Sequence, residues 1–136
     1  MSNPDRVAVI TGATGTLGQE VTRQLAGQGV RLALLDHSIE RLKKIQTSLS
    51  LPADRLLALN VDLLSGQDVQ KASKTILEKF GQVDFLLHLV GGWTGGKTLL
   101  ETEADEISFM LNQHLWTTYH VIRAFVPRLT NSSQGR

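Results

Sequence analysis

Three regularly spaced glycines mark the stretch TGATGTLG, residues 11–18, as the first candidate for chemistry. Gly12, Gly15 and Gly18 follow an apolar run and precede a segment with helical periodicity. Glycine permits a tight turn and lets the backbone approach a phosphate, and a helix N-terminus offers unpaired N–H groups and partial positive charge. The stretch therefore predicts a cradle for the pyrophosphate of a dinucleotide. The alternative is a tight strand-to-helix turn with no ligand.

A carboxylate, Asp36, ends the next apolar run. At this place a carboxylate can accept hydrogen bonds from the adenosine ribose of a dinucleotide, and it repels a 2′-phosphate. Residues 11–18 contain no Lys or Arg, and the residue after Asp36 is His37 rather than arginine. The pattern favours NAD over NADP as the cofactor. The alternative role of Asp36 is to cap the helix that begins near Ser38, and one carboxylate could do both.

The elements that must position these residues alternate along the chain. Apolar runs predict strands over residues 6–10, 31–35, 55–61 and 84–90. Apolar residues at helical spacing predict helices over 16–28, 39–49, 66–80 and 103–129. The stripe expected along one face of the last helix consists of Ile107, Leu111, Leu115, Thr118, Ile122 and Val126. The alternation predicts an α/β fold of the doubly wound Rossmann type, with a parallel sheet between two helix layers.

Composition limits the classes of function. The 136 residues are 41% hydrophobic and 20% charged, which is typical of one soluble globular domain over 1–136, with a polar tail at 130–136 that we expect to be mobile. A net charge of +1 without a basic stripe argues against nucleic-acid binding. The chain has no cysteine, and its four histidines lack metal-ligand spacing, so we expect no metal. No apolar run has the length of a membrane span, and a cytoplasmic location is predicted.

Taken together, the glycine turn, Asp36 and the later segments resemble the short-chain dehydrogenase/reductase family from Val7 to Pro127. The usual turn of that family is TGxxxGxG, whereas TGxxGxxG here is similar to its extended and atypical branches. The resemblance implies a strand order of 3-2-1-4 and a Rossmann domain that binds NAD, with NADP less favoured. It implies that the segment NVDL, residues 60–63, places Asp62 against the adenine. The cofactor-binding residues that it implies are Gly12, Thr14, Gly15, Thr16, Leu17, Gly18, Asp36, Asp62, Leu63, Val90, Gly91 and Gly92.

The sequence also departs from the family at recognisable positions. The family motif Asn-Asn-Ala-Gly is replaced by HLVG at 88–91, and we expect His88 to be a neutral buried side chain with one backbone hydrogen bond. The asparagine of the family's catalytic Asn-Ser-Tyr-Lys set aligns with His114. That histidine could hold a water molecule or relay a proton, or simply pack against the sheet. The loop GGWTGG, residues 91–96, resembles dihydropteridine reductases, which use NADH.

The resemblance places a fifth strand, a catalytic Ser and a Tyr-x-x-x-Lys motif after residue 136. The one tyrosine of the chain, Tyr119, has Arg123 at i+4, but it lies in the wrong helix and arginine does not exchange a proton. One hypothesis is the cofactor-binding half of an NAD-dependent oxidoreductase that acts on a carbonyl or alcohol and forms a homo-oligomer. The other is an NAD(P)-binding or interaction module without catalysis. A truncated product, a partly recorded chain and a half-domain completed by a partner all fit the sequence.

Overall fold

Four parallel strands form the central sheet, in the order β3-β2-β1-β4. The structure is a computed structural model, and it describes residues 5–136. The strands are β1 (Val7–Thr11), β2 (Arg31–Asp36), β3 (Leu56–Asn60) and β4 (Phe85–His88). Their parallel pairing and order confirm the predicted Rossmann-type sheet.

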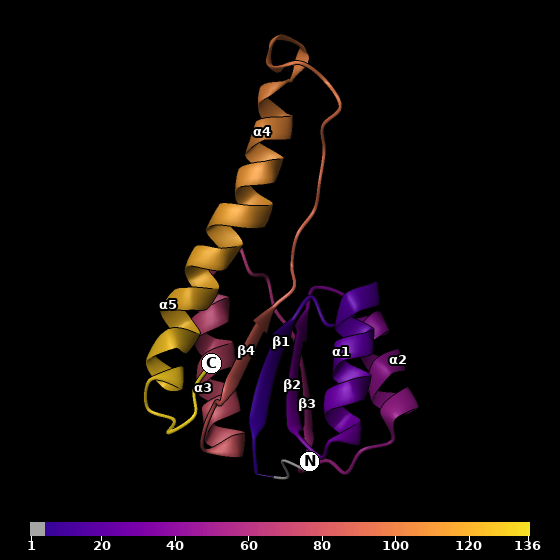
Figure 1. Ribbon diagram of the computed structural model, residues 1–136, viewed down its shortest axis with the longest axis vertical. Coiled ribbons are helices and arrows are strands. Elements are labelled where there is room, and N and C mark those ends of the chain that lie inside the picture. Colours follow the sequence, from indigo (N-terminus) through magenta and orange to yellow (C-terminus); the bar gives the residue numbers. More distant parts are fainter. Residues whose placement is uncertain (1–4) are drawn as a thin grey trace.

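Helices cover both faces of this sheet, with α1 and α2 on one side and α3 and α5 on the other (Figure 1). The helices are α1 (Thr16–Gly27), α2 (Ile39–Leu49), α3 (Gly66–Phe80), α4 (Ala104–Leu111) and α5 (Thr117–Leu129), with a 3₁₀ turn η1 (Leu99–Glu101) and a π-helical turn η2 (Asn112–Trp116). No helix within residues 5–136 is both long enough and apolar enough to cross a membrane.

Capping residues explain why α2 and α3 have the bounds that the sequence predicts. The Ser38 and Ser65 side chains accept hydrogen bonds from Arg41 N and Asp68 N, which satisfies free amides in the first turn of each helix. Gly81, with φ at 78°, ends α3 in the left-handed conformation that glycine adopts without strain. Local side-chain chemistry therefore fixes both helices.

The core consists of two apolar layers separated by the sheet. All five residues of β1 are buried, and their side chains alternate between the layers, as the twofold repeat of a strand requires. Val7 and Val9 pack in the cluster that contains Ile76 and Phe125, whereas Ile10 packs with Leu42 on the other face. Burial on both faces explains the near-continuous apolar character of the central strands β1 and β2, whereas β3 and β4 at the sheet edges are only partly buried.

The long C-terminal helix is continuous from 104 to 129 but contains η2 at residues 112–116. The side chains that α5 buries are Thr117, Val121, Ala124 and Phe125. Much of the expected stripe is exposed: Ile107, Leu111, Leu115, Ile122 and Val126 all lie on the surface. A π turn contains an extra residue, so positions after it are rotated by roughly 100° from those extrapolated at 3.6 residues per turn. Together with the loop after β4, α4 forms an arm that projects beyond the sheet (Figure 1).

The C-terminal tail lies beside β4, at the sheet edge. Arg136 N donates to Asp84 O at 2.8 Å, and Leu86 N donates to Arg136 O at 2.9 Å. The Ser132 hydroxyl also donates to the buried Asp84 carboxylate at 2.5 Å. The tail thus has defined contacts along the outer edge of β4, and the mobility expected for 130–136 stays a prediction.

Candidate cofactor-binding site

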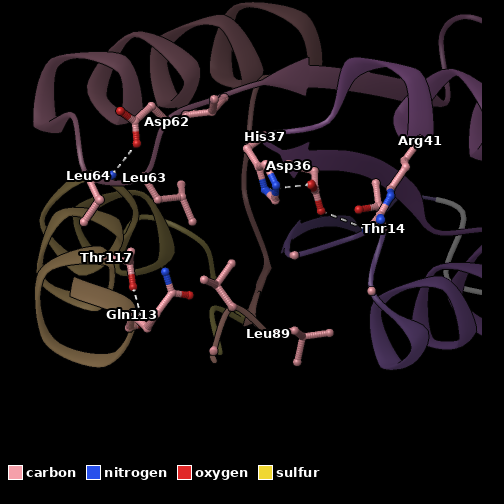
Figure 2. A pocket seen from close by; sticks show the side chains of 15 residues that line it. Thr14, Asp36, His37, Arg41, Asp62, Leu63, Leu64, Leu89, Gln113 and Thr117 are labelled. Carbon is pink, nitrogen blue, oxygen red and sulfur yellow. Dashed lines mark hydrogen bonds and ion pairs between the residues drawn. The ribbon is translucent and has the colours of Figure 1, made fainter. Parts of the chain in front are cut away.

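A cleft of about 380 Å³ opens at the carboxyl ends of the strands, where the chain order reverses between β1 and β4 (Figure 2). Ligands of open α/β sheets bind at this switch point. The lining residues are Gly12, Thr14, Gly15, Asp36, His37, Arg41, Val61, Asp62, Leu63, Leu64, Leu89, Val90, Gly91, Gln113 and Thr117.

The three glycines of the turn serve different purposes. Gly12 has φ at 67°, and a Cβ at Gly18 would lie 2.2 Å from Gly12 O, so the fold itself requires glycine at both positions. A Cβ at Gly15 would meet only Gly12 O, at 3.4 Å, which is an ordinary contact. The packing of the chain does not explain the missing side chain of Gly15, which lines the cleft. A ligand that approaches the backbone here does explain it.

The N-terminus of α1 supplies donors at this point. The first backbone hydrogen bond of the helix runs from Gln19 N to Gly15 O at 2.9 Å, so the amides of 16–18 have no acceptor within the helix. Gly15 occupies the N-cap position without a side chain to satisfy them, and the first turn carries no acidic residue. Free amides and the positive end of the helix dipole suit a phosphate group.

The Asp36 carboxylate forms the second part of the site. It is 6% exposed, and its Oδ2 accepts the Thr14 N–H at 3.0 Å (Figure 2). Its Oδ1 accepts the Ser38 N–H at 3.3 Å. Ser38 caps α2 with its own hydroxyl, so Asp36 does not act as the helix cap. A carboxylate has about four lone-pair sites. Asp36 therefore retains acceptor capacity toward ribose hydroxyls while it holds the glycine turn to β2.

The structure brings most of the predicted cofactor residues together. Eight line the cleft: Gly12, Thr14, Gly15, Asp36, Asp62, Leu63, Val90 and Gly91. Four do not line it: Thr16, Leu17, Gly18 and Gly92. Asp62 turns its Oδ1 toward Leu64 N at 2.9 Å, which fixes the loop after β3.

Seven lining residues were not foreseen from the sequence: His37, Arg41, Val61, Leu64, Leu89, Gln113 and Thr117. Arg41 lies in the first turn of α2, the helix that follows Asp36. Its place in the predicted helix is the one signal in the sequence that could have identified it as a lining residue. His37 Nδ1 lies 3.3 Å from Asp36 Oδ1, and Arg41 lines the cleft near them, so the Asp36 end of the cleft carries charges of both signs. Gln113 and Thr117 form part of the opposite wall of the cleft, and the Thr117 hydroxyl donates to Gln113 O at 2.8 Å.

His114, the position aligned with the family asparagine, lies in the π turn η2 and is exposed. Its Nε2 lies 2.6 Å from Gly92 O, and a Cβ at Gly91 would lie 3.3 Å from its Cε1. The side chain therefore fastens the loop after β4 to the helix and does not line the cleft. π turns are frequent at functional sites.

His88 makes different contacts from those expected. Its Nδ1 lies 2.7 Å from Thr11 Oγ1, and its Nε2 lies 3.1 Å from Thr118 Oγ1. The expected single backbone hydrogen bond is thus replaced by two threonine hydroxyls on β1 and α5. Burial lowers the pKa of His88 below its ordinary value, because the charged imidazolium loses hydration there.

Comparison with known proteins agrees with this geometry. The family model described as short chain dehydrogenase matches residues 6–136, and the chain belongs to the short-chain dehydrogenase/reductase family. An uncharacterized oxidoreductase of Staphylococcus epidermidis is 25% identical over 131 residues, which are 96% of this chain and 55% of the relative. The 1,6-dihydroxycyclohexa-2,4-diene-1-carboxylate dehydrogenase of Pseudomonas putida is 31% identical over 130 residues, covering 96% and 48%.

A solved structure of NAD⁺-bound xylitol dehydrogenase superposes with a TM-score of 0.89 at 25% identity, covering 97% of this chain and 51% of that one. The chain spans about half the length of the curated relatives it matches. Its similarity therefore supports a family of oxidoreductases that use a nicotinamide cofactor. Within the described part of the chain, no three metal-ligating side chains converge on one point.

Proposed function

We propose that this chain binds a nicotinamide dinucleotide in the strand-end cleft and is the cofactor-binding half of an oxidoreductase that acts on a carbonyl or alcohol. Gly15 carries the proposal, because the fold leaves its Cβ position open at the N-terminus of α1. In the proposed complex the pyrophosphate lies beside Gly15 at the N-terminus of α1, where the amides of 16–18, just outside the cleft lining, have no acceptor within the helix. Asp36 holds the ribose, and Asp62 with Leu63 borders the adenine.

The other end of the cleft would receive the nicotinamide. Val90 and Gly91 line it where β4 ends, opposite Gln113 and Thr117. When bound, the cofactor would supply the hydride acceptor or donor, and the protein would supply orientation and electrostatics. His114 would act indirectly, since it holds the loop at Gly92. The substrate would approach from the side of the loop after β4. The likeness of its segment GGWTGG, residues 91–96, to dihydropteridine reductases stays a prediction.

The proton step of such a reaction needs an acid or base near the substrate. The Ser and Tyr-x-x-x-Lys that the family resemblance implies are not among the 136 residues, and Tyr119 lies outside the cleft lining with its hydroxyl bonded to Arg123. We propose that these groups come from residues that extend the sheet beyond β4, where Arg136 already pairs. A cytoplasmic location stays part of the proposal.

The exposed stripe on the long helix supports self-association. Leu115, Ile122 and Val126 are each at least 40% exposed, and Trp116 lies beside them at 47%. A contiguous apolar patch on a helix indicates an interface, and aromatic residues are enriched in such interfaces. We therefore propose a homo-oligomer formed through this helix.

The preference for NAD is assigned to Asp36. Its charge would oppose a 2′-phosphate, although Arg41 lines the same end of the cleft. We expect Asp36→Ala to weaken NADH binding by about tenfold, the effect of losing one charge-assisted hydrogen bond, and to narrow the difference between NADH and NADPH. Asp36→Asn is the matched control, because its amide oxygen can still accept the Thr14 N–H, while the charge and the acceptor for Ser38 N are removed. Unchanged affinity for both cofactors, measured by fluorescence titration, would show that the assignment is wrong.

A further inference from the structure

The His88 bridge lies directly behind the cofactor cleft. Its two partners, Thr11 and Thr118, are the chain neighbours of the lining residues Gly12 and Thr117. The bridge thus joins β1, β4 and α5 at the point where all three reach the cleft.

Contacts between the glycine turn and the end of β4 are tight. A Cβ at Gly12 would lie 3.0 Å from both the carbonyl carbon and the oxygen of Leu89. Leu89 N also donates to Thr11 O at 3.2 Å and to Thr11 Oγ1 at 3.3 Å. A shift of His88 would therefore be passed to the turn through the backbone of the next residue.

The hydrogen bonds define the protonation state that fits. Because Thr11 Oγ1 accepts the Leu89 N–H, its own proton is free to point toward His88 Nδ1. His88 Nε2 then carries the ring proton and donates to Thr118 Oγ1. A neutral imidazole offers this one acceptor and one donor, whereas an imidazolium donates from both nitrogens and would turn the Thr11 hydroxyl proton away.

The surroundings of His88 offer little to stabilise a positive charge. Its partners on β1 and α5 are uncharged hydroxyls. The titratable groups along η2 and the first part of α5 have partners of their own: His114 is bonded to Gly92 O, Tyr119 is bonded to Arg123, and His120 packs against Gly66 of α3. On the β4 side, the Asp84 carboxylate is already used by Val7 N and Ser132. Burial lowers the pKa of His88, which agrees with a neutral ring.

We propose that His88 is a positioning residue for cofactor binding. The neutral side chain holds the turn at Gly12 and the end of β4 against α5, and protonation of the ring releases these elements. Affinity for the cofactor then falls as the pH drops through the pKa of His88 in the free chain. This inference rests on the proposed function, because the released elements are the walls of the proposed cofactor cleft.

The test is the dissociation constant of NADH measured by fluorescence between pH 8 and pH 5 on the full 136-residue chain. We expect the constant for the wild type to rise by up to about tenfold per pH unit below the free pKa of His88, the limit for a single linked proton. The same series is run in the His37→Asn background, because His37 is a second histidine that lines the cleft. His120→Asn serves as a histidine control and should retain the pH profile, because His120 packs against Gly66 at the start of α3 and does not line the cleft.

His88→Asn should flatten the acid limb of the profile while it binds NADH at pH 8. If that variant does not fold, two substitutions of Thr118 provide the test. Thr118→Ser retains the acceptor for His88 Nε2 and should keep the wild-type pH profile. Thr118→Val removes this acceptor and should weaken NADH binding at pH 8. Equal pH profiles in the wild type and His88→Asn, or equal binding by the two Thr118 variants, would overturn this inference alone. Failure of the folded wild type to bind NADH at pH 8 would overturn the proposed function and this inference together.

Discussion

The strand-end cleft and the projecting arm differ in how far their side chains are buried. In the cleft, Thr14 and Asp36 are buried, and each is fixed by a hydrogen bond between separate elements. In the arm, Trp93 is 75% exposed and Leu100 is 99% exposed. The loop is held mainly by polar contacts to α4, such as Lys97 Nζ to Glu106 Oε2 at 2.8 Å.

This difference in burial distinguishes cofactor binding, which we expect of the chain alone, from the covering of apolar side chains, which needs a partner. The walls of the cleft that would contact pyrophosphate and adenosine come entirely from elements within the 136 residues. The apolar side chains of the arm have no comparable cover in the described residues. We therefore expect the isolated chain to bind the cofactor. We expect the apolar side chains of the arm and of the outer face of α5 to be buried only in a larger assembly.

The largest effect is expected where the fold itself requires a glycine. A Cβ at Gly18 would lie 2.2 Å from Gly12 O and 2.8 Å from Ala13 Cα, so the backbone of the turn must move. We expect Gly18→Ala to lower the free energy of unfolding by about 3 kcal/mol, at the upper end of overpacking costs, and to abolish NADH binding. Urea unfolding followed by circular dichroism measures this. A stability like that of the wild type would show that the turn is less tightly packed than described.

A smaller effect is expected at the outer face of the long helix. Ile122→Glu places a charge in the exposed apolar stripe and should weaken self-association by at least about tenfold, the cost of burying an unpaired charge being more than 1.4 kcal/mol. NADH affinity should not change, because Ile122 does not line the cleft. Sedimentation velocity measures the association. Lys43→Gln on the surface of α2 gives the same change in net charge, and an equal response of both variants would contradict an interface at this helix.

The smallest effect concerns Arg41 at the adenosine end of the cleft. Arg41 is exposed, so a salt bridge to a 2′-phosphate would be worth about 1 kcal/mol or less. Arg41→Gln should weaken NADPH binding by about threefold to fivefold and leave NADH binding unchanged. Competition titrations with the two cofactors measure the ratio. A larger loss for NADH than for NADPH would show that Arg41 contacts a group common to both.

The sequence predicted the four strands and the bounds of α2 and α3 from local signals, such as the hydroxyl of Ser38 and the glycine at 81. The strand order followed from the family resemblance, and β4 ends at His88, two residues before its expected end. Prediction from the sequence failed where the geometry depends on distant contacts. The π turn at 112–116 shifts the buried face of α5, so the 3.6-residue repeat pointed to Ile122 instead of Val121. The partners of His88 likewise come from strands and helices far apart in the sequence, and no local pattern identifies them.

Gly15 provides the most direct test of the central claim that the cleft binds a dinucleotide phosphate. The measurement is a calorimetric titration of the wild type and of Gly15→Ala with NADH, alongside their unfolding free energies. We predict saturable binding to the wild type and binding at least about tenfold weaker to Gly15→Ala, while the unfolding free energy changes by no more than about 1 kcal/mol, the cost of alanine at an N-cap. Equal NADH affinity of the two folded proteins, or no saturable binding to the wild type, would contradict the account.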